Sequence, residues 1–162
     1  LYNTYIYFIF LCSIFLVGCA LQGARAEEEQ SNFDCLVEAL YFEARNQDFT
    51  SQLAVATVIM ERVRLEWFPK DICSVVHEGK RWEGHIVRDA CEFSYYCDGK
   101  HERMVEFDAV IQAMEVADLA MRGGLVEDVM GATHYHASYV LPYWAEEMEY
   151  LGQIGHHKFY VE

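Results

Sequence analysis

Basic residues are scarce in this sequence. Lys and Arg total 12 against 26 Asp and Glu, which gives a formal net charge of −14. The basic residues form no run, whereas a surface that binds nucleic acid needs clustered Lys and Arg. A nucleic-acid partner is therefore excluded, and the acidity itself is typical of a solvated protein surface.

Several catalytic signatures are also missing. The sequence has no serine nucleophile elbow, P-loop, dinucleotide-binding fingerprint or H-E-x-x-H motif. It also has no internal repeat or low-complexity tract. Hydrophobic residues make up 53% of the chain and aromatic residues 15%, so the chain can bury the core of one ordinary domain.

The N-terminus resembles an export signal. Tyr5 to Val17 is an uncharged apolar run, short for a bilayer span but typical of a signal-peptide core. Ala24-Arg25-Ala26 fits a cleavage site, while Leu16 to Cys19 resembles a lipobox that would place a lipid on Cys19. A buried or membrane-anchoring helix is the alternative.

This pattern predicts a leader over residues 1–26, a polar linker over 27–32 and one domain over 33–162. We expect an exported protein of the periplasm or cell envelope, or a secreted one. Its contact with a membrane would come only through the leader or a lipid anchor at Cys19.

Four cysteines lie beyond the leader, which agrees with an oxidising compartment. They allow three pairings. We favour Cys91–Cys97, which closes a short loop, together with Cys35–Cys73, which joins the first expected helix to the third. A zinc site is the alternative, but none of the four forms the C-x-x-C pair with which thiolate zinc sites usually begin.

Hydrophobic spacing predicts a mainly helical domain with a small sheet or ribbon. Caps and breakers place the helices from Ser31 or Asn32 to about Arg45, from a cap at Asp48 or Thr50 to a stop at Pro69, from Asp71 to His77, and from Glu106 to Arg122. Thr133–Ala137 and Gly155–Val161 are expected to be extended. Residues 78–101 show no sustained period and predict a long loop, which in a compact domain is usually functional.

Glu43 is the sharpest candidate for chemistry. Its spacing from Leu36 and Leu40 puts it on or beside the apolar face of the first helix. Burial raises the pKa of a carboxyl group and so suits it to protonate a glycosidic oxygen near neutral pH. The plainer interpretation is a helix-end glutamate paired with Arg45.

Histidines and aromatic residues offer a rival site. His134 and His136 fall on one side of an expected strand, as zinc ligands can, and His156 or His157 could complete the set. Ordinary hydrogen-bonded roles are the alternative for each histidine. Near them, aromatic side chains could either stack on sugars or pack in the core: Tyr139, Tyr143 and Trp144.

Taken in order, these motifs resemble the SleB/CwlJ-type cell wall hydrolases. The resemblance covers Cys35 to Tyr160 and rests on an ordered series: Ala39–Arg45, Gln52–Ala56, Glu61–Val63, Phe68-Pro69, Cys91–Ser94, Cys97–Gly99, Ala132–His136, Pro142–Ala145 and Ile154–Phe159. The family implies an α+β, mainly helical domain similar to lysozyme-like lytic transglycosylases, with a small β-sheet or ribbon.

The resemblance implies cleavage of the peptidoglycan glycan strand, by a lytic transglycosylase or muramidase, with Glu43 as the single catalytic acid. It also implies that Phe93, Ser94 and Tyr135 lie at the substrate cleft. Because its ring could stack on sugars, we expect Trp144 to be a further substrate-binding residue. No metal or other cofactor is expected, and the protein should be a monomer. Two alternatives stay open: a zinc-dependent amidase or peptidase using the histidines, and a glycan-binding envelope domain without activity.

Overall fold

The computed structural model describes the backbone from Tyr2 to Glu162 and the side chains from Gln22 onward. The chain divides into two compact units, residues 1–32 and residues 33–162. Helix α1 (Tyr2–Ala44) supplies the whole described backbone of the first unit and the opening helix of the second. The side chains of the expected leader segment, Tyr5–Val17 with Cys19, lie outside the described residues.

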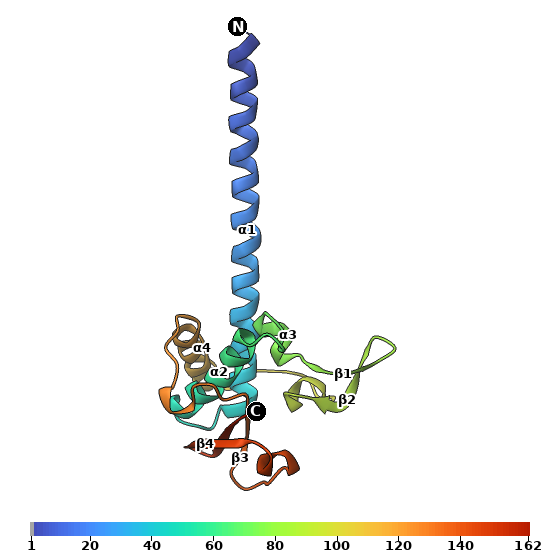
Figure 1. The fold of residues 1–162 in the computed structure, drawn as a ribbon, viewed down its shortest axis with the longest axis vertical. Helices are drawn as coiled ribbons and strands as arrows, with labels where there is room; N and C mark the ends of the chain where they lie inside the picture. The colour runs from blue at the N-terminus through green and yellow to red at the C-terminus, as the bar shows by residue number, and fades with distance from the viewer. Residues whose placement is uncertain (1) are drawn as a thin grey trace. The chain divides into compact units, whose positions relative to one another are not determined.

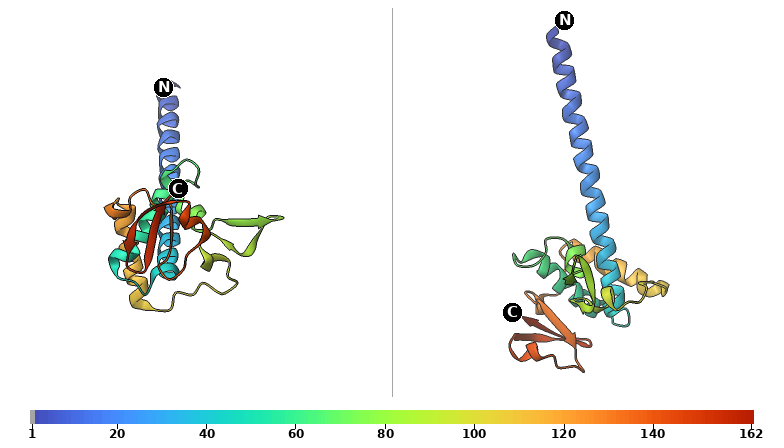
Figure 2. Two further views of the ribbon diagram at one scale, coloured as in Figure 1. Left: turned by 60° about the horizontal axis from the view of Figure 1, so that its bottom comes forward. Right: turned by 90° about the vertical axis from the view of Figure 1, so that its right-hand side faces the viewer.

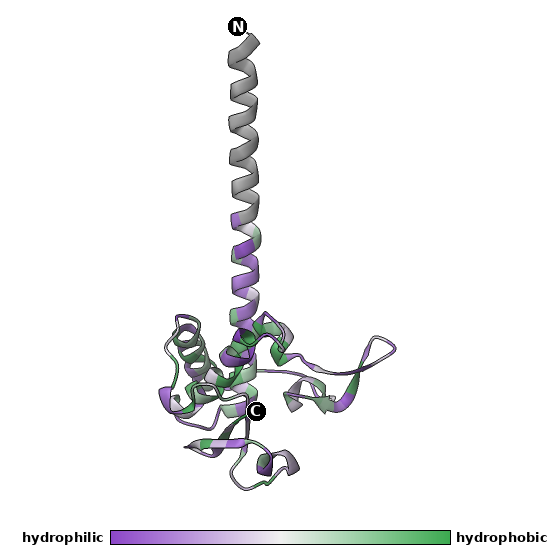
Figure 3. Cartoon of the chain, in the orientation of Figure 1, coloured by the Kyte–Doolittle hydropathy of each residue, from purple (hydrophilic) through white to green (hydrophobic). Residues whose placement is uncertain are grey.

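The first helix begins far earlier than the sequence analysis expected. We expected a start at Ser31 or Asn32, which is wrong, because α1 is helical from Tyr2 through the stretch expected to be a linker. The run Glu27-Glu28-Glu29-Gln30 consists of good helix formers. The helix therefore continues through Ser31 and Asn32, and neither residue acts as its N-terminal cap. The described residues before Asn32 are exposed and mostly hydrophilic (Figure 3). Within the described part of the chain, no helix combines the length and apolarity needed to cross a bilayer.

Three helices pack around the last turns of α1 in the second unit, as Figures 1 and 2 show: α2 (Phe49–Arg64), α3 (Ile72–Val76) and α4 (Phe107–Met121). The expected cap at Asp48 is confirmed, since its carboxylate accepts the Ser51 N–H at 2.9 Å. Asp71, expected as the first residue of the third helix, caps α3 by accepting the Ser74 N–H at 2.8 Å. These caps satisfy backbone donors that the helix itself leaves unpaired. Leu36, Leu40, Ile59, Val75 and Val116 are among the fully buried side chains of the shared core.

Part of the expected loop 78–101 is a β-hairpin, so the loop expectation is wrong there. Strands β1 (Gly79–Trp82) and β2 (His85–Cys91) pair antiparallel. Glu83 and Gly84 both have positive φ, as a tight two-residue hairpin turn requires. The hairpin extends away from the helices (Figures 1 and 2). Its residues are mostly exposed, so no buried face imposed the alternation of apolar residues from which strands are recognised.

A second, three-stranded antiparallel sheet has the order β3-β5-β4. Strands β3 (His134–Ala137) and β5 (His157–Val161) match the two expected extended segments, whereas β4 (Glu149–Ile154) was missed. Single turns of 3₁₀ helix complete the second unit at Ser94–Cys97 (η1), Glu127–Val129 (η2) and Tyr143–Glu146 (η3). The expected α+β class is confirmed.

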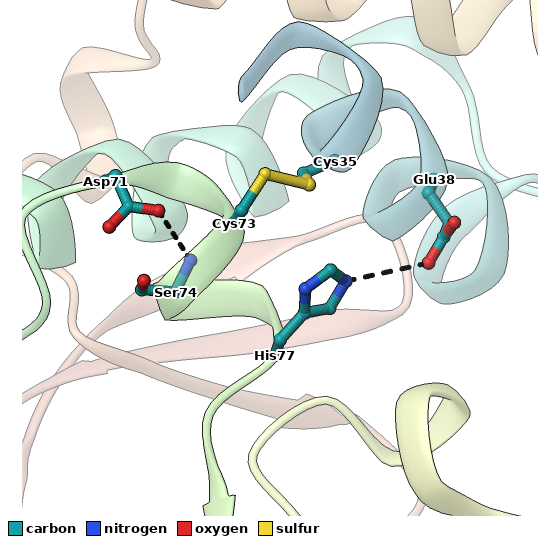
Figure 4. The surroundings of a disulfide bond; sticks show 6 residues. All are labelled: Cys35, Glu38, Asp71, Cys73, Ser74 and His77. Atoms are coloured by element: carbon teal, nitrogen blue, oxygen red, sulfur yellow. Dashed lines mark hydrogen bonds and ion pairs between the residues drawn. A yellow bond between two sulfur atoms is a disulfide. The ribbon is translucent and has the colours of Figure 1, made fainter. Parts of the chain in front are cut away.

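The structure contains both disulfides that the sequence analysis favoured. Cys35–Cys73 joins α1 to α3, and Cys91–Cys97 closes the turn between β2 and the end of η1. Figure 4 shows the first of them beside the ion pair of Glu38 and His77. The two helical elements that flank the hairpin are therefore covalently linked, α3 to α1 and η1 to β2.

Candidate active site

Glu43 lies in the last turn of α1 with its side chain partly buried. The Tyr135 hydroxyl donates a hydrogen bond to Glu43 Oε2 at 3.0 Å. Burial raises the pKa of the Glu43 carboxyl group, and the Tyr135 hydrogen bond lowers it by a smaller amount. The structure thus brings together two residues that are 92 positions apart and that were both expected at the site.

Strand pairing fixes Tyr135 in place. Tyr135 lies opposite Phe159 on the neighbouring strand β5, and its ring contacts those of His157 and Phe159 at centroid distances of 5.2 and 6.0 Å. Burial raises the pKa of the Tyr135 phenol well above its ordinary value, and the nearby Glu43 charge adds to the shift. The hydroxyl therefore stays protonated and acts as a hydrogen-bond donor toward Glu43.

Tyr95 is a neighbour that the sequence analysis did not single out. Its ring stacks on Phe42 with centroids 5.0 Å apart, directly before Glu43 in α1. Burial raises the Tyr95 pKa most, and the negative charges of Glu38, Glu43 and Glu102 raise it further. The short disulfide-closed segment Cys91–Cys97 carries Tyr95, so that staple brings a second protonated phenol close to the acid.

Arg62 connects the residues before Tyr135 to the segment that carries Glu92 and Phe93. Its guanidinium is almost fully buried, and Nε donates to the Thr133 carbonyl at 2.7 Å, two residues before Tyr135. One terminal nitrogen lies 3.6 Å from Glu92, and the guanidinium also covers the rings of Phe68 and Phe93. Arg62 lies within the Glu61–Val63 motif of the resemblance, but nothing in its spacing indicated this connecting role.

Two other expected site residues, Phe93 and Ser94, lie in different environments. Phe93 is only 2% exposed and belongs to the main core under Arg62, which leaves little of its ring for a ligand. Ser94 is exposed at the first position of η1. Ser94 is therefore open to a substrate, whereas Phe93 supports the segment that carries it.

Trp144, His134 and His136 form a separate cluster on the other face of β3, whereas His157 contacts Tyr135. Side chains alternate across a strand, so His134 and His136 point away from the face that carries Tyr135. The Trp144 ring lies 5.4 Å from His134 and 5.5 Å from both His136 and Tyr160. Trp144 therefore lies on the face of β3 opposite to Tyr135, and its role in substrate binding stays a prediction.

Hydrogen bonds account for the ring nitrogens of His136. Nδ1 lies 2.9 Å from the Ala137 carbonyl, and Nε2 lies 3.0 Å from the Tyr160 hydroxyl. A carbonyl only accepts, so Nδ1 donates to Ala137, while Nε2 pairs with the Tyr160 hydroxyl. Among the described residues, no group of three His, Cys, Asp or Glu side chains has an arrangement that could hold a metal ion.

The family model of the cell wall hydrolases matches residues 46–160. The chain belongs to the cell wall hydrolase family, and it is an enzyme that acts on peptidoglycan. Glu43 lies just before the matched range, whereas Tyr135, Tyr95 and Arg62 lie within it.

Solved structures show the same fold. The catalytic domain of the germination-specific lytic transglycosylase SleB from Bacillus anthracis matches with a TM-score of 0.63 and 23% identity, covering 81% of this chain and 94% of that one. The catalytic domain of the Bacillus cereus SleB protein matches with a TM-score of 0.56 and 21% identity, covering 81% and 90%. The lysozyme-like α+β fold expected from the sequence is thereby confirmed. A comparison with curated protein sequences finds no significant match.

Proposed function

We propose that this enzyme cleaves the glycan strand of peptidoglycan with Glu43 as its single acid and base. The observation that carries the proposal is the partly buried Glu43 carboxyl group held by the Tyr135 hydroxyl at 3.0 Å. Burial favours the protonated form of the acid, which the first step needs. Because the Bacillus anthracis neighbour is a lytic transglycosylase, the same reaction is the first choice here.

In this mechanism Glu43 donates its proton to the glycosidic oxygen as the bond from that oxygen to the sugar C1 breaks. The N-acetyl group of the same sugar stabilises the positive charge at C1. The sugar's 6-hydroxyl then attacks C1 and closes a 1,6-anhydro ring, and the Glu43 carboxylate takes the proton of that hydroxyl. Tyr135 donates to the carboxylate formed in between. No second carboxylate is needed, because the substrate itself supplies the stabilising N-acetyl group and the attacking 6-hydroxyl.

Hydrolysis is the second candidate reaction. A water molecule would replace the 6-hydroxyl, and a second acidic residue would activate it in an inverting enzyme. Glu38 and Glu102 are the acidic neighbours that act on Tyr95 together with Glu43. Glu43 keeps the role of acid in either reaction, and the chemical end of the product separates the two.

Mass spectrometry of fragments released from purified sacculi tests the proposal. A lytic transglycosylase releases fragments that end in 1,6-anhydro-N-acetylmuramic acid and resist borohydride reduction. Reducible glycan ends that depend on Glu43 would indicate hydrolysis. Free stem peptides with intact glycan strands would instead identify an amidase, and the proposal of glycan cleavage would then be wrong.

We also propose that the chain is exported, with its leader removed after Ala26 or with lipid on Cys19. The two disulfides support export, because such bonds persist in oxidising compartments. Intact-mass analysis of protein recovered from the cell envelope tests the proposal. Recovery of a chain that still carries Tyr5–Val17 would contradict cleavage of the leader.

A further inference from the structure

A polar pocket lies between α3, β1 and η1, outside the Glu43 site. It has a volume of about 380 Å³, within the usual range for small-molecule sites. Its lining is polar and aromatic rather than aliphatic: Cys73, Ser74, His77, Glu78, Gly79, Arg81 and Tyr96. The glycan-cleaving mechanism uses none of these side chains.

Both disulfides border this pocket and make it rigid. Cys73 lines it directly and is bonded to Cys35 of α1 (Figure 4). Gly79 lines it too, and a Cβ on Gly79 would lie 2.7 Å from Cys91 Sγ of the second disulfide. The His77 ring stacks on Tyr96 with centroids 4.0 Å apart, which fixes a third side. The pocket is therefore pre-formed, and little ordering entropy would oppose a ligand.

Arg81 gives the pocket its exposed positive charge. Its side chain is exposed, and Nη1 makes a long contact of 3.4 Å with the Gly84 carbonyl, so most of the guanidinium donors stay available. Two acidic side chains adjoin the pocket: Glu38 pairs with His77 of the lining at 3.9 Å, and Glu78 is itself part of the lining. Burial and the Glu92 charge raise the pKa of Glu78, and Arg62 lowers it by a smaller amount. The Ser74 hydroxyl adds a neutral donor on the α3 side.

The pocket lies within reach of the catalytic residue. Glu38, the partner of His77, precedes Glu43 by five positions in α1, which corresponds to about 7.5 Å along a helix axis. An extended peptide spans about 3.3–3.6 Å per residue. Two or three residues of a peptide that begins at a sugar bound near Glu43 would therefore bridge to the pocket.

We propose that this pocket binds a free carboxylate of the peptidoglycan stem peptide, with Arg81 as its ionic partner and Ser74 as a further donor. The inference rests on the proposed glycan cleavage, because it makes the stem peptide the part of the substrate that lies beside the cut strand. It adds a preference that the Glu43 site alone does not give: strands with peptides should bind better than bare strands.

The test compares Arg81→Met with Lys80→Met, which removes an exposed cation from the adjacent position of the same strand without touching the lining. The substrates are intact sacculi and sacculi whose stem peptides an amidase has removed. Arg81→Met should raise KM for intact sacculi about tenfold with little change in kcat, as expected for one hydrogen-bonded charge pair near the surface. Lys80→Met should match the wild type on both substrates.

On stripped strands the wild type and Arg81→Met should have the same KM. An unchanged KM of Arg81→Met on intact sacculi would overturn the proposal, and so would a difference that persists on stripped strands. The KM of Arg81→Lys for intact sacculi should lie between those of the wild type and Arg81→Met, because lysine keeps the charge but lacks the planar guanidinium. Equal circular dichroism spectra and melting temperatures check that the variants fold.

A binding measurement separates this inference from the proposed reaction. Glu43→Gln protein is titrated with a soluble disaccharide tetrapeptide and with the same disaccharide without peptide, both with and without Arg81→Met. Tighter binding of the peptide form that Arg81→Met abolishes supports the pocket even if the bond cleaved is not glycosidic. Equal affinity for the two probes would contradict the pocket even if Glu43-dependent glycan cleavage is found.

Discussion

The two faces of strand β3 have different kinds of polar environment. On one face, Tyr135 directs its hydroxyl at Glu43, whose carboxyl pKa is raised by burial. On the other face, His134 and His136 contact Trp144, and both ring nitrogens of His136 lie within hydrogen-bond distance of protein groups. The first face therefore adjoins a carboxyl group with a raised pKa, whereas on the second face the His136 ring nitrogens already have protein partners.

The difference shows why residue type alone is a poor guide to chemistry. Histidine is the usual proton carrier near neutral pH, so the His-rich segment looked like a strong rival site. Desolvation lowers the pKa of His134 and of His157, which favours neutral rings suited to hydrogen bonding and aromatic packing. The opposite shift on Glu43 favours its protonated form, which is the form that the proposed general acid needs.

Glu43→Gln should cause the largest loss of activity. The amide keeps the size of the side chain and can still accept from Tyr135, but it has no proton for the leaving oxygen. Loss of general acid catalysis commonly lowers rates by about 10²–10⁴-fold. Turbidity clearing of purified cell walls measures the effect, and normal clearing by a folded variant would remove Glu43 from the mechanism.

The same variant predicts a change in stability with pH. Because the folded pKa of Glu43 is raised above 4.5, its contribution to stability is complete below that pH and is lost as pH rises through the folded pKa. Gln does not titrate, so the melting temperature of Glu43→Gln should gain on the wild type as pH rises. The wild-type rate should fall over the same alkaline range, as the acid ionises. A melting-temperature difference that does not vary with pH would contradict the raised pKa.

Tyr135→Phe should have a smaller effect with a distinct pH signature. It removes the hydrogen bond that lowers the Glu43 pKa, so burial acts unopposed and the alkaline limb of the pH–rate profile should move to higher pH. Loss of one hydrogen bond to a charged group should lower the rate at the optimum about tenfold. A lower rate with an unmoved limb would mean that Tyr135 acts through packing rather than through Glu43.

The sequence was informative where local rules decide the structure. The side chain of Asp48 caps the helix that it was expected to cap, and the pattern of Glu106–Arg122 gave α4 nearly to its ends. The disulfide pairing was also accessible, because loop length and helix order favoured one of three choices. Each of these features depends on residues close together or on a small number of alternatives.

Long-range packing was beyond the same reasoning. The burial of Arg62, and its bond to the Thr133 carbonyl, depend on how α2 meets β3, a separation of 71 residues. The Glu43 charge raises the pKa of Tyr95, whose ring stacks on Phe42, and neither contact could be inferred from sequence spacing. The start of α1 was also missed. Ser31 and Asn32 are good capping residues, but a helix begins at such a residue only when the residues before it are not helical.

Trp144→Leu tests the second face of β3. If the ring only packs against the two histidines and Tyr160, the substitution should lower the free energy of unfolding by about 1–3 kcal/mol, less than for a fully buried aromatic residue. The rate per folded molecule should change less than twofold. Unfolding in urea and wall clearing at saturating substrate give the two quantities. A raised KM with unchanged stability would show instead that Trp144 binds glycan.

Metal removal should have the smallest effect of all. A zinc amidase would need three ligands from the candidates His134, His136 and His156 or His157, and the rings of the first two already pair with protein groups. His136 would lose the Tyr160 hydroxyl or the Ala137 carbonyl, and an unpaired buried group costs about 1–3 kcal/mol. A glutamate acid with a tyrosine donor needs no ion, so wall clearing should be the same before and after dialysis against EDTA. A matched sample with zinc restored controls for damage by the chelator. Activity that EDTA abolishes and zinc restores would mean that a zinc ion bound by the histidines carries out the reaction, and that Glu43 is not the catalytic acid.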